Sequence, residues 1–173
     1  MDKELERLMN SYGDDVLRIA YMYLKDKYLA EDVFQEVFIK IYKNFSKFEK
    51  KSSEKTWIMS ITINACKDIL RNAWFKKVFT LDDSNNFSLT NRYVDIDVDD
   101  KVINSIQYEK LLSEVMNLPR KYKEPILLYY YEELSTADIS KILKIPEATI
   151  RSRLFRARKM LKINIDGKIE YEG

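Results

Sequence analysis

The chain has 173 residues, 46% of them hydrophobic, which is enough for one ordinary domain or two small ones and argues against global disorder. It contains no histidine, one cysteine and three glycines. This composition excludes His-based catalysis, His-ligated metal sites, an intrachain disulfide and a glycine-rich nucleotide loop. It therefore predicts a binding protein with an all-α fold, without enzyme activity, cofactor or metal.

The start of the chain carries charged residues rather than the apolar stretch of a secretory signal. No apolar run approaches about 20 residues, so no membrane span is expected. The single cysteine, Cys66, is expected to be a small buried residue in a helix. These features favour a cytoplasmic protein.

A first helical block is predicted over residues 1–75. Its first helix is expected to bury one face, formed by Leu17, Ala20, Tyr21 and Leu24. In the second helix, Val33, Val37 and Ile41 recur every four residues beside several aromatic side chains, so this helix should be largely buried. Residues 46–55 are polar and predict a loop.

A third helix follows that loop and is expected to end near Trp74. Its predicted apolar stripe consists of Ile58, Ile61, Ala65 and Ile69. Trp57, near the start of this helix, is interpreted as a core residue, with a place along the DNA path as the alternative.

Residues 76–103 lack a sustained apolar period and are interpreted as an acidic linker. Residues 81–100 contain six aspartates and one arginine, which gives this stretch a net charge of −5. An unstructured loop of this length is unusual inside a compact domain, which favours a linker between two domains.

The second block, residues 104–173, is also predicted to be helical. A helix over 105–117 is followed by helix onset near Pro119 and a break or restart near Pro125. The sequence Ser135-Thr136-Ala137-Asp138 matches a capping box that starts a short helix. Its expected inward residues are Ile139, Ile142 and Leu143.

Residues 144–146 predict a turn between that short helix and a last helix beginning at Glu147. The buried stripe of the last helix is expected to contain Ile150, Leu154, Ala157 and Leu161. Two helices joined by such a turn, with the second strongly basic, form a helix-turn-helix. Residues 141–162 carry eight basic residues against one glutamate, a net charge of +7.

The predicted helix-turn-helix favours DNA binding over an exposed basic helix that merely aids solubility. On flanking or outward positions relative to the buried stripe lie the residues expected to reach bases and phosphates in the major groove: Arg151, Ser152, Phe155 and Arg156. Arg153, Arg158 and Lys159 are better placed for phosphate contacts or a general positive field.

The segments around this motif resemble the extracytoplasmic-function (ECF) group of sigma-70 family sigma factors. Residues 118–122, 127–131 and 134–158 resemble domain four, which in that family reads the −35 promoter element. Residues 30–38 resemble the polymerase-binding helix of domain two, and Phe48 with residues 57–71 resembles the segment that recognises and opens the −10 element. The two likenesses occur in the family's order and at its separation.

The resemblance implies three sets of contact residues. Core RNA polymerase would be bound by Asp32, Gln35 and Glu36, for which an ordinary solvated stripe is the alternative. The −10 DNA would be contacted by Lys40, Phe48, Asn64, Lys67 and Arg71. The −35 DNA would be contacted by Thr149, Arg151, Ser152, Arg153, Phe155 and Arg156.

By the same resemblance, the chain would be a monomeric sigma factor that directs promoter-specific transcription. An anti-sigma factor, often membrane-anchored in the family, would hold it until a stress or envelope signal arrives, and no small-molecule substrate is expected. Two features depart from the family: Lys144 occupies a turn position where glycine is common, and Pro125 interrupts a stretch that is commonly helical. The rival interpretations are a dimeric helix-turn-helix repressor or activator and a protein-binding helical adaptor.

Overall fold

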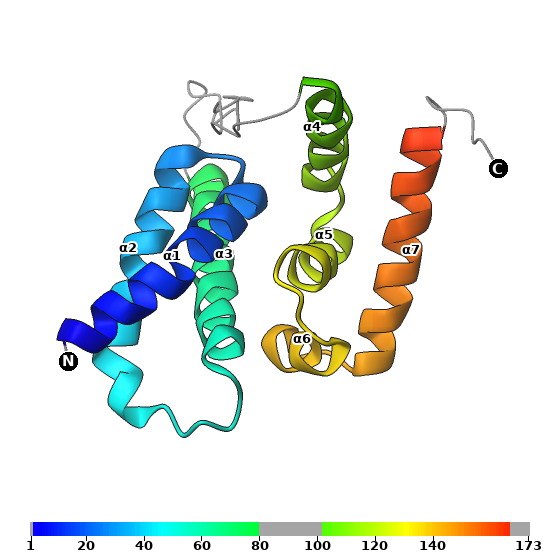
Figure 1. Ribbon diagram of the computed structural model, residues 1–173. Helices are drawn as coiled ribbons and strands as arrows, with labels where there is room; N and C mark the ends of the chain where they lie inside the picture. The colour runs from blue at the N-terminus through cyan, green and yellow to red at the C-terminus, as the bar shows by residue number, and fades with distance from the viewer. Residues whose placement is uncertain (1, 80–101, 167–173) are drawn as a thin grey trace. The chain divides into compact units, whose positions relative to one another are not determined.

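The computed structural model describes residues 2–79 and 102–166. All regular secondary structure in these residues is helical, and the helices form two compact units (Figure 1). The predicted all-α fold is therefore confirmed for this part of the chain. None of its helices combines the length and the apolar character needed to cross a membrane.

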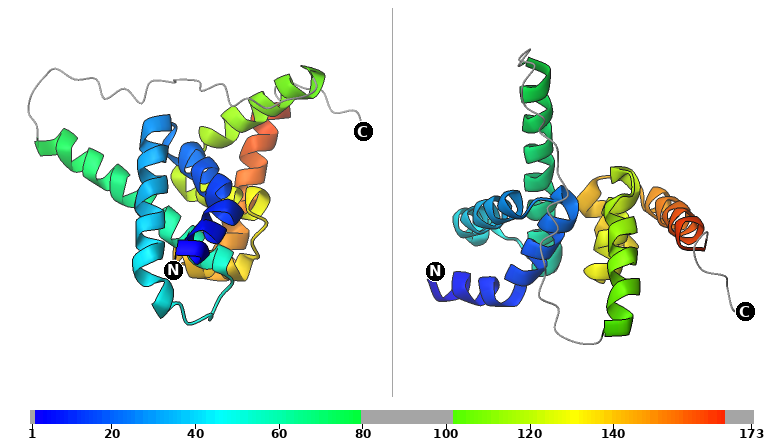
Figure 2. Two further views of the ribbon diagram at one scale, coloured as in Figure 1. Left: turned by 60° about the vertical axis from the view of Figure 1, so that its left-hand side comes forward. Right: turned by 90° about the horizontal axis from the view of Figure 1, so that it is seen from above.

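Three helices build the first unit: α1 (Asp2–Leu24), α2 (Lys27–Asn44) and α3 (Glu54–Phe79). A short 3₁₀ turn, η1 (Phe45–Lys47), follows α2. Each of the three helices contacts the other two, and Figures 1 and 2 show them side by side. The core therefore lies where the three helices meet.

The buried face of α1 differs from the predicted one. Val16, Ile19 and Ala20 are fully buried, whereas Leu17 is 39% exposed. Because α1 packs against α2 and α3 at once, the covered surface is rotated away from Leu17. Gly13 contributes to this packing, since a Cβ at that position would lie 3.3 Å from the ring of Phe34.

The apolar repeat of α2 is confirmed, but the helix is not largely buried. Val33, Val37 and Ile41 are fully buried, while Ile39 and Tyr42 are 54% and 45% exposed. Only the face turned toward α1 and α3 is covered. The remaining apolar side chains of α2 therefore form part of the surface.

The start of α3 is capped by Ser53, whose Oγ accepts a hydrogen bond from the backbone N–H of Thr56 at 3.1 Å. The predicted stripe is confirmed at Ile58 and Ala65, which are fully buried. Two other members of that stripe are only half-buried: Ile61 and Ile69. The helix runs to Phe79 rather than ending near Trp74, and two lysines in its last turn favour the continued helix.

The second unit contains α4 (Val102–Met116), α5 (Arg120–Ile126), α6 (Thr136–Leu143) and α7 (Glu147–Asp166). A five-residue π-helical turn, η2 (Leu127–Tyr131), continues α5. The longest helix described in this unit is α7, which can be followed in both views of Figure 2. It contacts α4, α5 and α6, so its inner face forms the centre of this unit's core.

The predicted helix break near Pro125 is wrong, because α5 continues through this residue into η2. The helical hydrogen bond that Pro125 cannot donate would end at the carbonyl of Lys121. Lys121 is exposed in the first turn of α5, where water can take the place of the missing donor. The proline therefore stays within the helix at small cost.

The helices reach beyond the predicted linker boundaries on both sides. Residues 76–79 belong to α3, and residues 102–103 belong to α4. The rest of the predicted acidic linker, residues 80–101, lies outside the described residues.

Candidate nucleic-acid interface

A tight corner between α6 and α7 forms the predicted helix-turn-helix. Ser135 Oγ accepts a hydrogen bond from the backbone N–H of Asp138 at 3.1 Å, which confirms the predicted cap. Helix α6 ends at Lys144, which adopts the left-handed backbone conformation with φ 56° and ψ 43°. The hydroxyl of Ser140 donates to the carbonyl oxygen of Ile145 at 2.6 Å, which ties α6 to the turn. These contacts set the direction in which α7 leaves the corner.

The inner face of α7 agrees with the predicted stripe. Ile150, Leu154 and Ala157 are 0%, 2% and 0% exposed, while Leu161 is half-buried. Four of the predicted −35 residues are exposed: Arg151, Ser152, Phe155 and Arg156. The other two, Thr149 and Arg153, are half-buried on the flank of the helix. The structure thus places the predicted set on one helix, with different degrees of access.

Arg151 is held by a contact chain that joins the two helices of the motif. Its Nη1 lies 3.0 Å from Oε1 of Glu147, in the first turn of α7. The same Oε1 accepts a hydrogen bond from the Thr136 hydroxyl at 2.7 Å, and Thr136 is the first residue of α6. The guanidinium of Arg151 is therefore oriented before any ligand binds.

Three tyrosines that the sequence analysis did not single out contact basic residues of α7. Burial raises the pKa of Tyr122 in α5, but the influence of Arg156 and Lys121 outweighs it, so the pKa is lowered. Tyr130 in η2 accepts a hydrogen bond from Arg158 Nε at 2.5 Å, and the Arg158 guanidinium also lies over the Tyr129 ring. Tyr129 lies beside Tyr130, with ring centroids 5.0 Å apart. The run of tyrosines just before the helix-turn-helix could have drawn attention to these residues in the sequence. Their contacts with α7 depend on tertiary packing, which the sequence pattern does not reveal.

The predicted polymerase contacts lie on the outer surface of α2. Asp32 and Gln35 are exposed, and Glu36 is half-exposed and paired with Lys40, with 2.5 Å between Oε1 and Nζ. A residue predicted to meet polymerase and one predicted to meet −10 DNA are thus ion-paired. An apolar groove adjoins Gln35, with a volume of about 320 Å³, and is also lined by Leu5, Met9, Phe34, Phe38, Ile39 and Tyr42.

Three aromatic rings meet where the loop joins α3. The Phe48 ring is stacked on Trp57, with centroids 4.8 Å apart, and the Phe45 ring lies 6.2 Å from Trp57. Trp57 is half-buried, so it is neither a full core residue nor an isolated surface residue. One face of Phe48 is therefore covered by Trp57.

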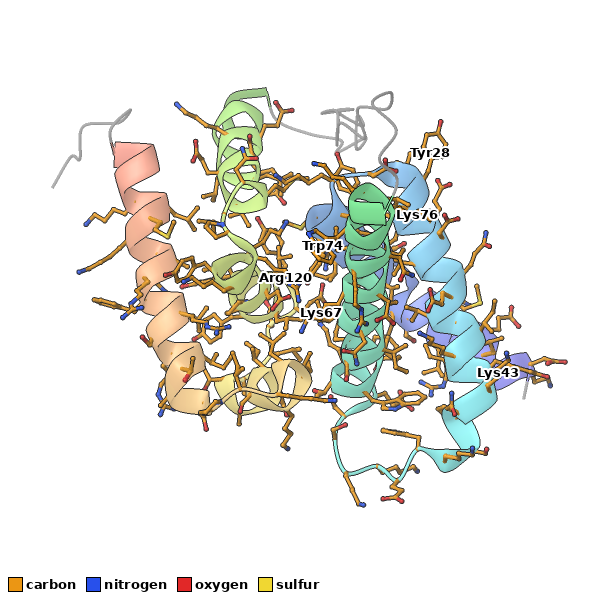
Figure 3. The ribbon with its side chains drawn as sticks, turned by 180° about the vertical axis from the view of Figure 1, so that it is seen from behind. Tyr28, Lys43, Lys67, Trp74, Lys76 and Arg120 are labelled. Carbon is orange, nitrogen blue, oxygen red and sulfur yellow. The ribbon has the colours of Figure 1, made fainter. Side chains whose placement is uncertain are left out.

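The remaining predicted −10 residues lie along α3. Asn64 and Arg71 are exposed, and Lys67 is half-buried. Trp57, Asn64 and Arg71 are spaced by seven residues, which places them on one side of the helix about 10 Å apart. Arg71 forms an ion pair with Asp68. Figure 3 shows Lys67 and, further along α3, Trp74.

An ionic contact fixes the start of α3 against α1. Arg7 Nη2 lies 2.7 Å from Oε1 of Glu54, the first residue of α3, and 2.5 Å from Oε1 of Glu4. Hydrogen bonds to Glu4 and Glu54 raise the pKa of Arg7. The hydroxyl of Tyr12 donates to Glu54 at 3.4 Å, and burial with the Glu54 charge raises the pKa of Tyr12. The loop that carries Phe48 therefore leads into a fixed helix start.

Cys66 is fully buried, as predicted. Among residues 2–79 and 102–166, no group of three or more histidine, cysteine, aspartate and glutamate side chains is arranged to hold a metal ion.

Known proteins match both units of the chain. Residues 8–76 match the family Sigma-70 region 2, and residues 108–161 match Sigma-70, region 4. The ECF RNA polymerase sigma factor SigM of Bacillus subtilis is 33% identical over 159 residues, covering 91% of this chain and 93% of that protein. The chain belongs to the ECF group of the sigma-70 family. It is therefore a transcription initiation factor and not an enzyme, and its partners are core RNA polymerase and promoter DNA.

Other ECF sigma factors are similar over most of the chain. The ECF RNA polymerase sigma-E factor of Haemophilus influenzae is 30% identical over 167 residues, covering 94% of this chain and 88% of that protein. Two solved structures share the fold. RpoE from Bartonella quintana, in complex with the anti-sigma factor NepR, has a TM-score of 0.73 at 20% identity and covers 96% of this chain and 99% of its own. CnrH, in complex with the cytosolic domain of CnrY, has a TM-score of 0.69 at 16% identity, with 98% and 92% covered.

Membership of the ECF group confirms the resemblance found in the sequence. The repressor and adaptor interpretations are no longer needed, because both units match sigma factor regions in the expected order.

Proposed function

We propose that this ECF sigma factor divides promoter recognition between its two units. Residues 1–75 bind core polymerase and the −10 element, residues 76–103 act as an acidic linker, and residues 104–173 bind the −35 element. The observation that carries this proposal is α7, a helix with a fully apolar inner face and an exposed face rich in arginine. Such a helix, held by a short partner helix, fits the major groove of duplex DNA.

On the −35 element, the first turns of α7 enter the major groove. Arg151 and Arg156 are exposed, and Arg151 is oriented by its ion pair with Glu147, which suits contacts with guanine edges. Ser152 and Phe155 reach the same groove, the latter through apolar contact with bases. Thr149 and Arg153, on the flank, contact the phosphate backbone.

On the −10 element, the loop before α3 captures a base from the melted strand. Phe48 stacks on the base with the ring face that Trp57 does not cover, while Asn64 hydrogen-bonds a base edge. Lys40, Lys67 and Arg71 contact phosphates. Capture of single-stranded DNA in this way stabilises the open promoter without ATP.

Core polymerase binds the outer surface of α2. Asp32, Gln35 and Glu36 form hydrogen bonds and ion pairs with a basic helical surface of the polymerase. Gln35 also lines the apolar groove between α1 and α2, so the polar contact and the groove form one continuous surface.

An anti-sigma factor controls the free protein. The support is that RpoE, which shares the fold, was solved in complex with the anti-sigma factor NepR. The anti-sigma factor holds the protein in the cytoplasm until a stress or envelope signal releases it, and the released protein is a monomer.

Reconstitution with sigma-free core polymerase and a randomised promoter library tests the division of work. Sequencing of the transcribed promoters should yield two conserved elements. Ala substitution at Arg151 should alter preferences only in the upstream element, and Ala substitution at Asn64 only in the downstream element. Changes in the opposite elements, or no conserved upstream element, would contradict the assignment.

A further inference from the structure

A network of charged side chains joins α1 to the start of α3. Arg7 in α1 donates to both oxygens of the Glu54 carboxylate, with 2.7 Å from Nη2 to Oε1 and 3.2 Å from Nη1 to Oε2. Glu54 is the first residue of α3. Nε of Arg7 also donates to Oε1 of Glu4 at 2.9 Å. The guanidinium is therefore held between two carboxylates, one on each helix.

Two further residues extend this network. The hydroxyl of Tyr12, also on α1, donates to Oε2 of Glu54 at 3.4 Å. Lys50 lies in the loop before α3, with φ 54°. The hydrogen bond with Arg7 lowers the pKa of Glu4, and the charge of Lys50 lowers it further, so Lys50 is within electrostatic reach of α1. The loop therefore meets charges of α1 at Lys50 and, where it ends, at Glu54.

The network is too exposed to be needed for the fold. The side chains of Arg7, Glu4 and Glu54 are 43%, 42% and 29% exposed. Ion pairs at such exposure contribute little to the free energy of unfolding. The buried apolar face of α1 holds this helix on α2 and α3 without them. What the network determines is the position of the start of α3, rather than the stability of the unit.

The aromatic stack of the −10 loop lies next to this network. Trp57 follows Glu54 within the first turn of α3, and its backbone N–H donates to the carbonyl oxygen of Ser53 at 3.1 Å. The ring of Trp57 is stacked on Phe48, with centroids 4.8 Å apart. A start of α3 that moves away from α1 takes Trp57 with it, and the free face of Phe48 turns as well.

We propose that Arg7 and Glu54 are positioning residues for base capture at the −10 element, acting through Trp57 on Phe48. The proposal rests on the base capture proposed for Phe48 and extends it to α1, where no DNA contact is predicted. The ion pair holds the start of α3 so that Phe48 takes up its base-receiving position before DNA binds. Conformational entropy that the loop would lose on binding is then already lost on folding.

A double-mutant cycle in the reconstituted holoenzyme tests the proposal. The ligand is a single-stranded −10 oligonucleotide with 2-aminopurine at the extruded base. Arg7→Ala should weaken binding about fivefold, the cost of ordering one side chain on binding, and should leave the bound fluorophore less quenched. In the Phe48→Ala background, Arg7→Ala should have no further effect, because the ring that it positions is gone. Lys3→Ala, which removes the same charge from an exposed position one turn earlier in α1, is the matched control and should change nothing.

Charge reversal separates positioning from a direct DNA contact and from a loss of fold. Arg7→Glu and Glu54→Arg should each weaken binding, and the double variant should recover most of the affinity, because the pair is restored with its signs exchanged. The slope of log affinity against log salt should be the same for Arg7→Ala and wild type, since no phosphate contact is lost. The urea midpoint of Arg7→Ala should stay close to that of wild type.

Several results would overturn the proposal. They are an unchanged affinity of Arg7→Ala, a lower salt slope, a reversed pair without recovery, and weakened binding to core polymerase with unchanged −10 affinity. Phe48→Ala with wild-type affinity would count against base capture itself. A loss from Arg7→Ala that adds to that of Phe48→Ala would count only against the positioning.

Discussion

The ring of Phe48 lies against the ring of Trp57, with centroids 4.8 Å apart and planes inclined by 28°. Phe48 belongs to the loop and Trp57 to the first turn of α3, so the stack joins the loop to the helix. Since Arg7 and Glu54 fix that helix start to α1, the position of Phe48 is set by the first unit as a whole. A loop aromatic with a fixed position is suited to receive a base, because little conformational entropy is lost on stacking.

Replacing Phe48 by Ala should weaken binding of single-stranded −10 DNA to the holoenzyme by about 1–3 kcal/mol, the usual contribution of one base–aromatic stack. Trp57→Leu should cause a smaller loss, because it removes the support and keeps the stacking ring. A 2-aminopurine at the extruded position reports the stack through its fluorescence. Tyr28→Ala, which removes an exposed aromatic ring of α2, is the control and should have no effect. Unchanged affinity of Phe48→Ala for single-stranded −10 DNA would show that Phe48 does not stack on a base.

Glu147→Gln should loosen −35 recognition rather than abolish it. The substitution removes the negative charge of Glu147, which orients Arg151. The Glu147 carboxylate also accepts a hydrogen bond from the Thr136 hydroxyl. Overall affinity for duplex DNA should rise, since one carboxylate beside the phosphates is lost. Discrimination against altered −35 sequences should fall by up to about 1–3 kcal/mol, the value of one bidentate base contact. Competition binding with paired duplexes measures both changes, with Glu133→Gln as an exposed control. Unchanged discrimination would show that Arg151 does not read bases.

The sequence predicted buried faces where apolar residues recur at a regular helical spacing. Val33, Val37 and Ile41 are buried, as their spacing requires. Prediction failed where tertiary packing or the surroundings of one backbone carbonyl decide the outcome. Leu17 is exposed because α1 is covered by two helices, and Pro125 stays helical because the affected carbonyl lies in an exposed turn.

The candidate site divides in the same way. The basic face of α7 is a local property, so the exposed Arg151 and Arg156 follow from helical spacing alone. The side chains that contact these arginines cannot be predicted from helical spacing. Tyr122 reaches Arg156, and Tyr130 reaches Arg158, only because α5 and η2 pack against α7. Sequence spacing finds the residues that face outward, and tertiary packing decides which of them are oriented.

Tyr122 should lose its proton at lower pH than an ordinary tyrosine. Partial burial raises the pKa of its phenol, but the hydrogen bond with Arg156 and the charge of Lys121 outweigh burial, and the net pKa lies below the ordinary 10.0. Because the folded-state pKa is lowered, the stabilising contribution is complete above the unfolded value of about 10 and is lost as pH falls through the folded value. Ultraviolet titration of tyrosinate should show an early component that is absent in Tyr122→Phe. In Arg156→Ala this component should move to higher pH, and its persistence at low pH would contradict the assigned cause.

Replacing Lys144 by Gly should stabilise the second unit. Lys144 has φ 56° and ψ 43°, a conformation that costs a residue with a Cβ roughly 1–2 kcal/mol and costs glycine nothing. Glycine also gives the unfolded chain more freedom, which offsets part of that gain, so a net increase of about 0.5–1 kcal/mol is expected. Lys141→Gly, three residues earlier inside α6, should instead destabilise by about 1 kcal/mol, because glycine there loses helix propensity. Urea unfolding followed by circular dichroism measures both variants. Equal destabilisation by the two substitutions would show that the turn does not hold Lys144 in a strained conformation.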